Sequence, residues 1–78
     1  MDHSAIFAKV VDLVSETLEC DAASLTEAAR YDELGADSFD LLELVTAFED
    51  EFGLTMDDDS LQSIETIGDS VDAIVAAQ

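Results

Sequence analysis

The segment Leu34–Asp40, with the sequence LGADSFD, marks where the central helix of the chain begins. Gly35 lets the backbone turn, and Asp37 is of a type that caps a helix N-terminus with its side-chain oxygen. Asp40, three residues further on, is placed to return a hydrogen bond or to complement the helix dipole. We therefore expect a helix over residues 38–52.

Apolar residues recur at helical spacing along this expected helix, and Gly53 is suited to end it. The stripe that we expect to be buried consists of Leu41, Leu44, Val45, Phe48 and Phe52. A second edge, which we expect to be partly exposed because one small core cannot hold so wide an arc, contains Phe39, Leu42 and Thr46. The acidic residues that we expect in solvent are Glu43, Glu49, Asp50 and Glu51.

Two other segments show the same helical spacing and predict helices over residues 3–18 and 67–77. Thr66 with Asp69 resembles a capping box before the last helix, and a short helical turn is expected over residues 60–64. The expected buried stripe of the first helix is Ile6, Phe7, Val10, Leu13, Val14 and Leu18, and the apolar residues that predict the last helix are Ile67, Val71, Ile74 and Val75. Residues 19–36 lose the period and form a long connection, with Leu25, Tyr31 and Leu34 as anchors.

These elements predict an all-α fold, a small four-helix bundle with three main helices and one short helix. A long loop joins the first helix to the second. Residues 1–78 are expected to form a single domain, because a chain of 78 residues has material for only one core.

The charge of the chain is strongly negative: 20 Asp and Glu residues stand against Lys9 and Arg30, for a formal net charge of −18. Nucleic acids and anionic membranes are therefore excluded as partners, because both are bound by clustered cations. Proteins with basic docking patches are the partners that such a field attracts. No stretch approaches 18 apolar residues, so a cytoplasmic location is expected. We also expect the chain to be a monomer.

The candidate groups for catalysis and metal binding are few. Ser38 would need a general base to act as a nucleophile, and the single histidine, His3, is near the terminus, so no enzyme activity is expected. Cys20 is the only cysteine, which excludes an internal disulfide and a zinc framework. The cluster Asp57–Asp59 lacks the spacing of a calcium-binding EF-hand, because Gln62 stands where its glycine is needed, and we predict no metal site.

Ser38 is nevertheless well placed to be modified by another enzyme. A hydroxyl at the first helical position points outward, and a phosphodiester there lies near unpaired amide donors and the positive end of the helix dipole. Asp37 opposes this by charge repulsion. The position permits a phosphate linkage without requiring one.

The motif LGADSFD, followed by LELV at 42–45 and EDEFG at 49–53, closely resembles the acyl carrier protein family. The likeness continues through MDDD at 56–59 and IETIGD at 64–69, and so covers nearly the whole chain. The resemblance implies that Ser38 carries phosphopantetheine, transferred from coenzyme A by a phosphopantetheinyl transferase, and that Asp37 positions this helix start. Acyl groups would be held as thioesters on the arm, with the fold sheltering the acyl chain between its helices.

The resemblance also implies how partners dock. Glu43, Glu49 and Asp50 match the acidic recognition helix of the family, which binds basic patches on acyl transferases, ketoacyl synthases, reductases and dehydratases. Phe39, Leu42 and Thr46 would contribute contacts beside the attachment point. The family often has leucine at the position of Phe39, methionine at that of Thr46 and proline near Met56, and these departures put the pathway in doubt.

Three interpretations remain open at this point. A free-standing carrier of fatty acid biosynthesis agrees best with the acidic helix. A dedicated carrier for a polyketide, lipid A, amino-acid or D-alanine pathway is the alternative. A non-carrier acidic interaction module, in which Ser38 only begins a helix, also explains the charge but leaves the attachment motif unexplained.

Overall fold

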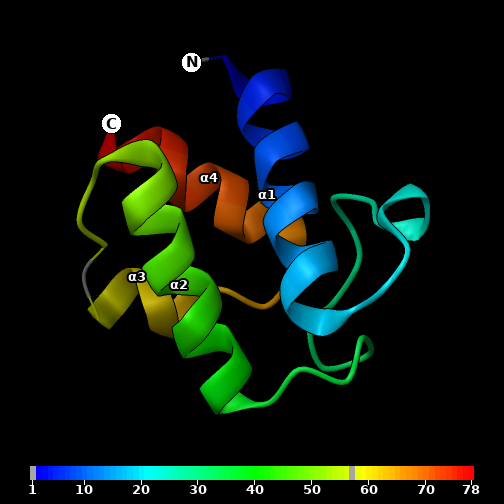
Figure 1. The fold of residues 1–78 in the computed structure, drawn as a ribbon. Helices are drawn as coiled ribbons and strands as arrows, with labels where there is room; N and C mark the ends of the chain where they lie inside the picture. Colours follow the sequence, from blue (N-terminus) through cyan, green and yellow to red (C-terminus); the bar gives the residue numbers. More distant parts are fainter. Residues whose placement is uncertain (1, 57) are drawn as a thin grey trace.

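The computed structural model describes residues 2–56 and 58–78, and these residues form four α-helices and one 3-10 turn. Figure 1 shows α1 and α2 running in opposite directions, with α4 packed behind them and the short α3 beside α2. The helices are α1 (His3–Leu18), α2 (Ser38–Phe52), α3 (Asp58–Ser63) and α4 (Ile67–Ala77), and the turn η1 covers Ala22–Ser24. The predicted all-α bundle with three main helices and one short helix is confirmed.

The core lies where α1 meets α2 and α4. Most of its side chains come from the predicted stripes, and burying each large apolar one stabilises the fold by about 1.5–3 kcal/mol. The residues that are almost completely buried include Ile6, Val10, Val14, Leu44, Phe48, Ile67, Val71 and Ile74. Phe7, Leu13, Leu18, Leu41 and Phe52 are only partly buried and pack around this core.

The predicted bounds of the third helix were wrong, and burial in α4 shows two further details. The third helix covers Asp58–Ser63, not residues 60–64, and Ile64 follows it as a buried residue outside the helix. Val75 is 40% exposed, because it is rotated by about 100° from the buried Ile74 and lies beyond the edge of the buried face. Ser70 is buried instead, on the face of α4 that contacts the core.

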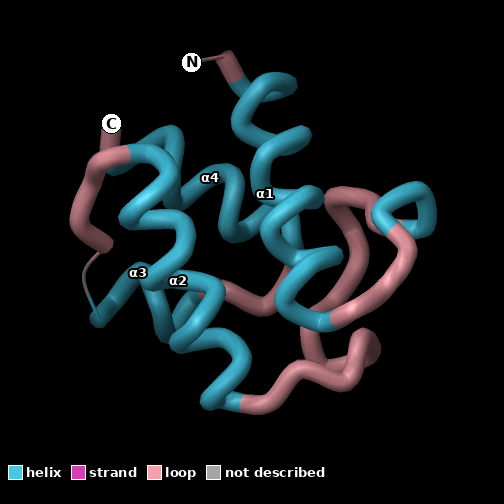
Figure 2. The backbone as a smooth tube through the Cα atoms, viewed as in Figure 1, coloured by secondary structure: helices cyan, strands magenta, loops and turns pink. Residues whose placement is uncertain are grey.

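The long connection between α1 and α2 packs against the start of α4, as Figure 2 shows for the loop segments. The Tyr31 amide donates to the Glu65 carbonyl at 3.0 Å, and the Ile67 amide donates to the Ala29 carbonyl at 3.0 Å. The Gly68 amide donates to the Glu27 carbonyl at 2.8 Å. The bonds from Ile67 and Gly68 satisfy amides in the first turn of α4 that no helical carbonyl can reach.

The expected anchors of this connection behave differently from one another. Leu25 and Tyr31 are buried, whereas Leu34 is half-buried. The Tyr31 hydroxyl lies 2.6 Å from the Ser70 hydroxyl, so the polar end of the ring is paired inside the core. The connection is therefore held by a side-chain pair as well as by backbone bonds, and it fixes the segment that leads into Ser38.

None of the helices in the described part of the chain has the length and apolarity needed to cross a bilayer.

Candidate functional site

Ser38 is the first residue of α2, and its side chain is exposed. Gly35, at φ 85°, turns the chain shortly before the helix, in a conformation that disfavours any residue with a Cβ atom. The Ala36 amide donates to the Tyr31 carbonyl at 3.0 Å and ties this turn to the buried anchor. The hydroxyl is thus presented by a fixed backbone at the surface, within reach of another protein.

A reciprocal capping box holds the start of α2. The Asp40 amide donates to Asp37 Oδ1 at 2.9 Å, and the Asp37 amide donates to Asp40 Oδ2 at 3.2 Å. Both carboxylates therefore have structural partners and also face the positive end of the helix dipole. The predicted capping role of Asp37 and Asp40 is confirmed. Ser38 lies in the helical turn that these two residues hold.

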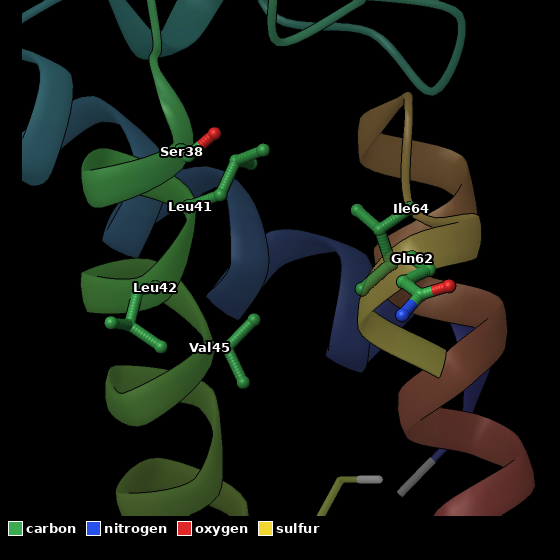
Figure 3. Close-up of a pocket in the computed structure, with 6 residues that line it drawn as sticks. All are labelled: Ser38, Leu41, Leu42, Val45, Gln62 and Ile64. Atoms are coloured by element: carbon green, nitrogen blue, oxygen red, sulfur yellow. The ribbon is translucent and has the colours of Figure 1, made fainter. Parts of the chain in front are cut away.

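An apolar pocket of about 210 Å³ opens beside Ser38, between α2 and the segment that contains α3. Figure 3 shows Leu41 and Val45 on α2 facing Ile64 and Gln62 across this space, with the Ser38 hydroxyl at one end. Aliphatic side chains line most of the pocket, so it suits an apolar chain. A group attached to Ser38 would begin at the pocket's mouth.

A second pocket of about 380 Å³ adjoins the first at Ser38 and has polar as well as apolar walls, and we call it the polar pocket. Its polar walls come from Arg30, Asp32, Asp37 and Glu65. Arg30 Nε and Nη2 donate to the two Asp32 carboxylate oxygens at 3.2 and 3.3 Å, and Arg30 Nη1 lies 3.9 Å from Glu65 Oε2. The hydrogen bond from Arg30 lowers the pKa of Asp32, and Asp32 in turn raises that of Arg30.

Sequence reasoning missed this polar pocket and the place of Arg30 in it. The pocket is assembled from the long connection and from the turn before α4, which are brought together by the backbone bridge between Arg30 and Thr66. A signal was present, since Arg30 is one of only two basic residues that are not histidine. Its position next to Ser38 depends on tertiary packing that no local pattern encodes.

Beside Ser38, the exposed edge of α2 is apolar. Phe39 is 66% exposed and Leu42 is 57% exposed, which confirms that this edge faces solvent. Thr46, one turn further on, is also exposed, and its hydroxyl donates to the Leu42 carbonyl at 3.0 Å. Large apolar side chains beside an exposed, modifiable hydroxyl form a surface that another protein can cover.

The acidic residues of α2 divide into two kinds. Glu43 and Asp50 are exposed, as predicted. Glu49 was expected in solvent but is half-buried, and its Oε2 accepts a hydrogen bond from the Met56 amide at 2.9 Å. This correction has a physical reason: the chain leaves α2 at Gly53 and turns back, so the Met56 amide needs an acceptor, and Glu49 provides it.

The described residues place no histidine next to Ser38. His3 lies at the start of α1, at the other end of the molecule from the start of α2 in Figure 1, and its Nε2 is 2.7 Å from Glu27 Oε1. Among residues 2–56 and 58–78, no three His, Cys, Asp or Glu side chains gather in a way that could hold a metal ion. Asp57, part of the acidic cluster considered above, lies outside the described residues.

Comparison with known proteins agrees with this geometry. Residues 8–74 match the family model for a phosphopantetheine attachment site. The acyl carrier protein of Thermotoga maritima is 50% identical over 70 residues, covering 88% of this chain and 86% of that protein. The acyl carrier protein AcpP of Rhizobium meliloti is 47% identical over 76 residues, covering 96% of this chain and 97% of that protein.

Solved structures show the same fold. The crystal structure of the Thermotoga maritima acyl carrier protein superposes with a TM-score of 0.83 at 34% identity, covering 97% of this chain and 89% of that one. The Enterococcus faecalis acyl carrier protein also gives 0.83 at 34% identity and covers both chains completely. The hexanoyl acyl carrier protein from the actinorhodin polyketide synthase of Streptomyces coelicolor superposes with a TM-score of 0.72. Its identity to this chain is 24%, so this likeness shows the fold alone.

The fold and the matched model define a phosphopantetheine-binding domain. Together with the identity to the bacterial carriers, they show that the chain belongs to the acyl carrier protein family. Covalent phosphopantetheine is accordingly its cofactor. The residues fit this group, because an exposed serine hydroxyl leads into two pockets that are large enough to receive parts of a flexible arm.

Proposed function

We propose that this protein carries growing acyl chains of fatty acid biosynthesis on a phosphopantetheine arm attached to Ser38. The observation that supports this most strongly is the position of an exposed serine at the start of α2, directly at the mouth of an aliphatic pocket. The arm supplies a terminal thiol on which acyl groups are held as thioesters. Because tethering raises the local concentration of the acyl group, each docked enzyme receives its substrate without a separate binding step.

Attachment requires only that Ser38 be reachable. A phosphopantetheinyl transferase would join Ser38 Oγ to the phosphorus of the pantetheine half of coenzyme A, while the pyrophosphate bond breaks and the nucleotide half leaves. The serine proton passes to a base of the transferase, since the described residues place no histidine beside Ser38. Asp37 contributes by holding the helix start, through its bond from the Asp40 amide.

The apolar pocket gives the protein its second task, which is to shelter the acyl chain. Leu41, Val45 and Ile64 would contact the methylene groups, and each buried methylene contributes about 0.8 kcal/mol. The walls come from two segments, α2 and the residues around Ile64, so small shifts of one against the other can adapt the space to different lengths. Chains in transit are thereby removed from water until an enzyme docks.

Docking is proposed to use α2. Glu43 and Asp50 present negative charge, and Phe39, Leu42 and Thr46 provide contacts beside Ser38. Acyl transferases, ketoacyl synthases, reductases and dehydratases with basic patches are the expected partners, steered by the field of the whole chain. We place this activity in the cytoplasm, with the carrier working as a monomer and performing no catalysis itself.

A reconstituted set of bacterial fatty acid synthesis enzymes tests this function. The wild-type carrier, supplied with coenzyme A, a transferase and malonyl donors, should gain covalently bound saturated acyl chains, detected by intact mass. Ser38→Ala should gain none, and Ser4→Ala, which alters an exposed serine in the first turn of α1, should behave as wild type. A loaded carrier that no fatty acid enzyme elongates would favour a dedicated carrier of another pathway.

A further inference from the structure

Ser38 lies at the boundary between two pockets of different chemistry. Ser38, Leu41 and Ile64 line both the aliphatic pocket and the polar one. The aliphatic pocket has an evident use for an acyl chain, but the polar pocket, which is the larger of the two, has none in the function proposed above. Any flexible group that begins at Ser38 can enter either space.

The polar pocket offers hydrogen-bond donors and acceptors together. The guanidinium of Arg30 provides donors, and the carboxylates of Asp32, Asp37 and Glu65 provide acceptors. A small anion would be repelled by the three carboxylates, which outnumber the one guanidinium. A small cation would be repelled by that guanidinium. A neutral chain that carries amides satisfies both kinds of group without adding charge.

We propose that the polar pocket seats the amide-bearing part of the arm attached to Ser38, with Arg30 donating to its carbonyl oxygens and Asp32 or Glu65 accepting from its N–H groups. Arg30 is therefore a positioning residue for the arm. The inference rests on the attachment to Ser38 proposed above.

The existing ion pairs of Arg30 leave it free to take up such a ligand. Its side chain is 45% exposed, and those of Asp32 and Glu65 are more exposed still. Exposed pairs of this kind contribute little to stability, so exchanging part of one for a bond to an amide costs little. The contact of Arg30 Nη1 to Glu65 is long at 3.9 Å, so this nitrogen can turn toward a carbonyl oxygen.

If the arm binds in this way, the protein holds the amides of the arm and the acyl chain in separate pockets. The amides lie against Arg30 in one pocket, and an apolar acyl chain lies against Val45 and Leu42 in the other. An arm without cargo would then be partly ordered. An unseated arm of the same length would move freely in solvent.

The arm can be observed directly if it alone carries isotopic labels. Coenzyme A labelled with ¹⁵N and ¹³C in its pantetheine half is used to load unlabelled protein, which is kept reduced and without an acyl group. In the wild type we expect NMR cross-peaks between the arm and side-chain protons of Arg30 and Leu41, and a positive heteronuclear NOE for at least one arm amide. Absence of these cross-peaks in the wild type overturns the proposal by itself.

Two variants with the same change of charge sharpen the test. Arg30→Gln should abolish the cross-peaks and reduce the arm NOE to that of the arm in free coenzyme A. Lys9→Gln removes a cation of nearly equal exposure, 46% against 45%, that pairs with Glu51 away from both pockets, and should leave the arm as in wild type. An arm NOE unchanged in Arg30→Gln, or lowered equally in both variants, contradicts the proposal.

Intact mass separates this inference from the function on which it rests. Both variants should be loaded to completion, because loading requires only that the exposed Ser38 hydroxyl be reachable. If the wild type is not loaded, the attachment at Ser38 is wrong. If it is loaded but its arm is unseated, only the role of the polar pocket is wrong.

Discussion

The hydroxyls of Tyr31 and Ser70 lie 2.6 Å apart inside the core and join the long connection to α4. Tyr31 is only 2% exposed and Ser70 is fully buried, so neither hydroxyl can bond to solvent and each is the hydrogen-bond partner of the other. The pair matters for function because the segment after Tyr31 leads through Gly35 into Ser38. Two buried polar groups thus help to fix the place where the carrier's arm would be attached.

Removing one member of this pair should cost more than removing both. Tyr31→Phe leaves the buried Ser70 hydroxyl without its partner, and we expect the free energy of unfolding to fall by about 1–3 kcal/mol. Adding Ser70→Ala to Tyr31→Phe should recover part of this loss, because neither polar group then remains. Urea unfolding of the two single variants and the double variant gives the coupling energy, and strict additivity would show that the bond has no net effect.

The same tyrosine makes stability sensitive to alkaline pH. Burial raises the pKa of Tyr31 from 10.0 to about 12, so the folded state keeps the phenol proton that the unfolded state loses. Stability is therefore unaffected by this group below pH 10 and falls as pH rises from about 10 to 12, by about 2 kcal/mol in total. Tyr31 is the only tyrosine, so tyrosinate absorbance reports its titration alone.

A control separates the contribution of Tyr31 from that of Lys9, which also titrates at alkaline pH. Lys9, the only lysine, pairs with Glu51, which raises its pKa as well. The alkaline loss should persist in Lys9→Gln and should disappear in the double variant Tyr31→Phe with Ser70→Ala. A loss of equal size in that double variant would assign it to other groups.

Glu19 ends α1 in a left-handed conformation with φ 54°, the only residue other than glycine with positive φ in the described chain. Glu19→Gly should raise the free energy of unfolding by about 0.5–1 kcal/mol, because glycine adopts this conformation without strain. Glu19→Ala removes the same charge but keeps the Cβ atom. Thermal unfolding should show stabilisation for glycine only, and an equal gain in both would indicate relief of charge repulsion.

Glu49 and Glu43 should differ when each is changed to alanine. Glu49→Ala removes the acceptor of the Met56 amide and should lower stability by about 1 kcal/mol, whereas Glu43→Ala, on the exposed face, should leave stability unchanged. Glu49→Gln keeps an oxygen that can accept this bond and removes only the charge. If both glutamates guide docking, Glu43→Ala and Glu49→Gln should slow acyl transfer at low salt while the fold stays intact.

Rates of acyl transfer measured at several salt concentrations test the docking role of these two glutamates. The difference in rate between each variant and the wild type should shrink as salt screens the exposed charges. Transfer that is unaffected by Glu43→Ala at low salt would remove this residue from the docking surface.

Much of the fold was predictable from local pattern. The caps of α2 and α4 were identified by the residue type at the cap and at the third position, and the structure shows both capping boxes closed. Helix period located α1, α2 and α4 because each buries one face. The apolar pattern of α4 includes the exposed Val75, because helical period alone does not say where the edge of the buried face lies.

The parts that escaped prediction are the ones made by segments far apart in sequence. The bond between Tyr31 and Ser70 and the pocket around Arg30 both form where the long connection meets the start of α4. Glu49 has the composition of a solvent-facing helix residue, yet the backbone at Met56 recruits its carboxylate. Gly35 and Asp37 predicted only that Ser38 begins a helix at the surface, and its role as attachment site was suggested by the resemblance of LGADSFD to the acyl carrier protein family.

The most direct test of the account is the mass of the intact protein before and after incubation with coenzyme A and a broad-specificity phosphopantetheinyl transferase. We predict that the wild type gains one phosphopantetheinyl group, that fragmentation places it on Ser38, and that Ser38→Ala gains none while keeping its helical content. A folded wild-type protein that gains nothing from an active transferase, or that is modified at another residue, would contradict the proposal that Ser38 carries the arm.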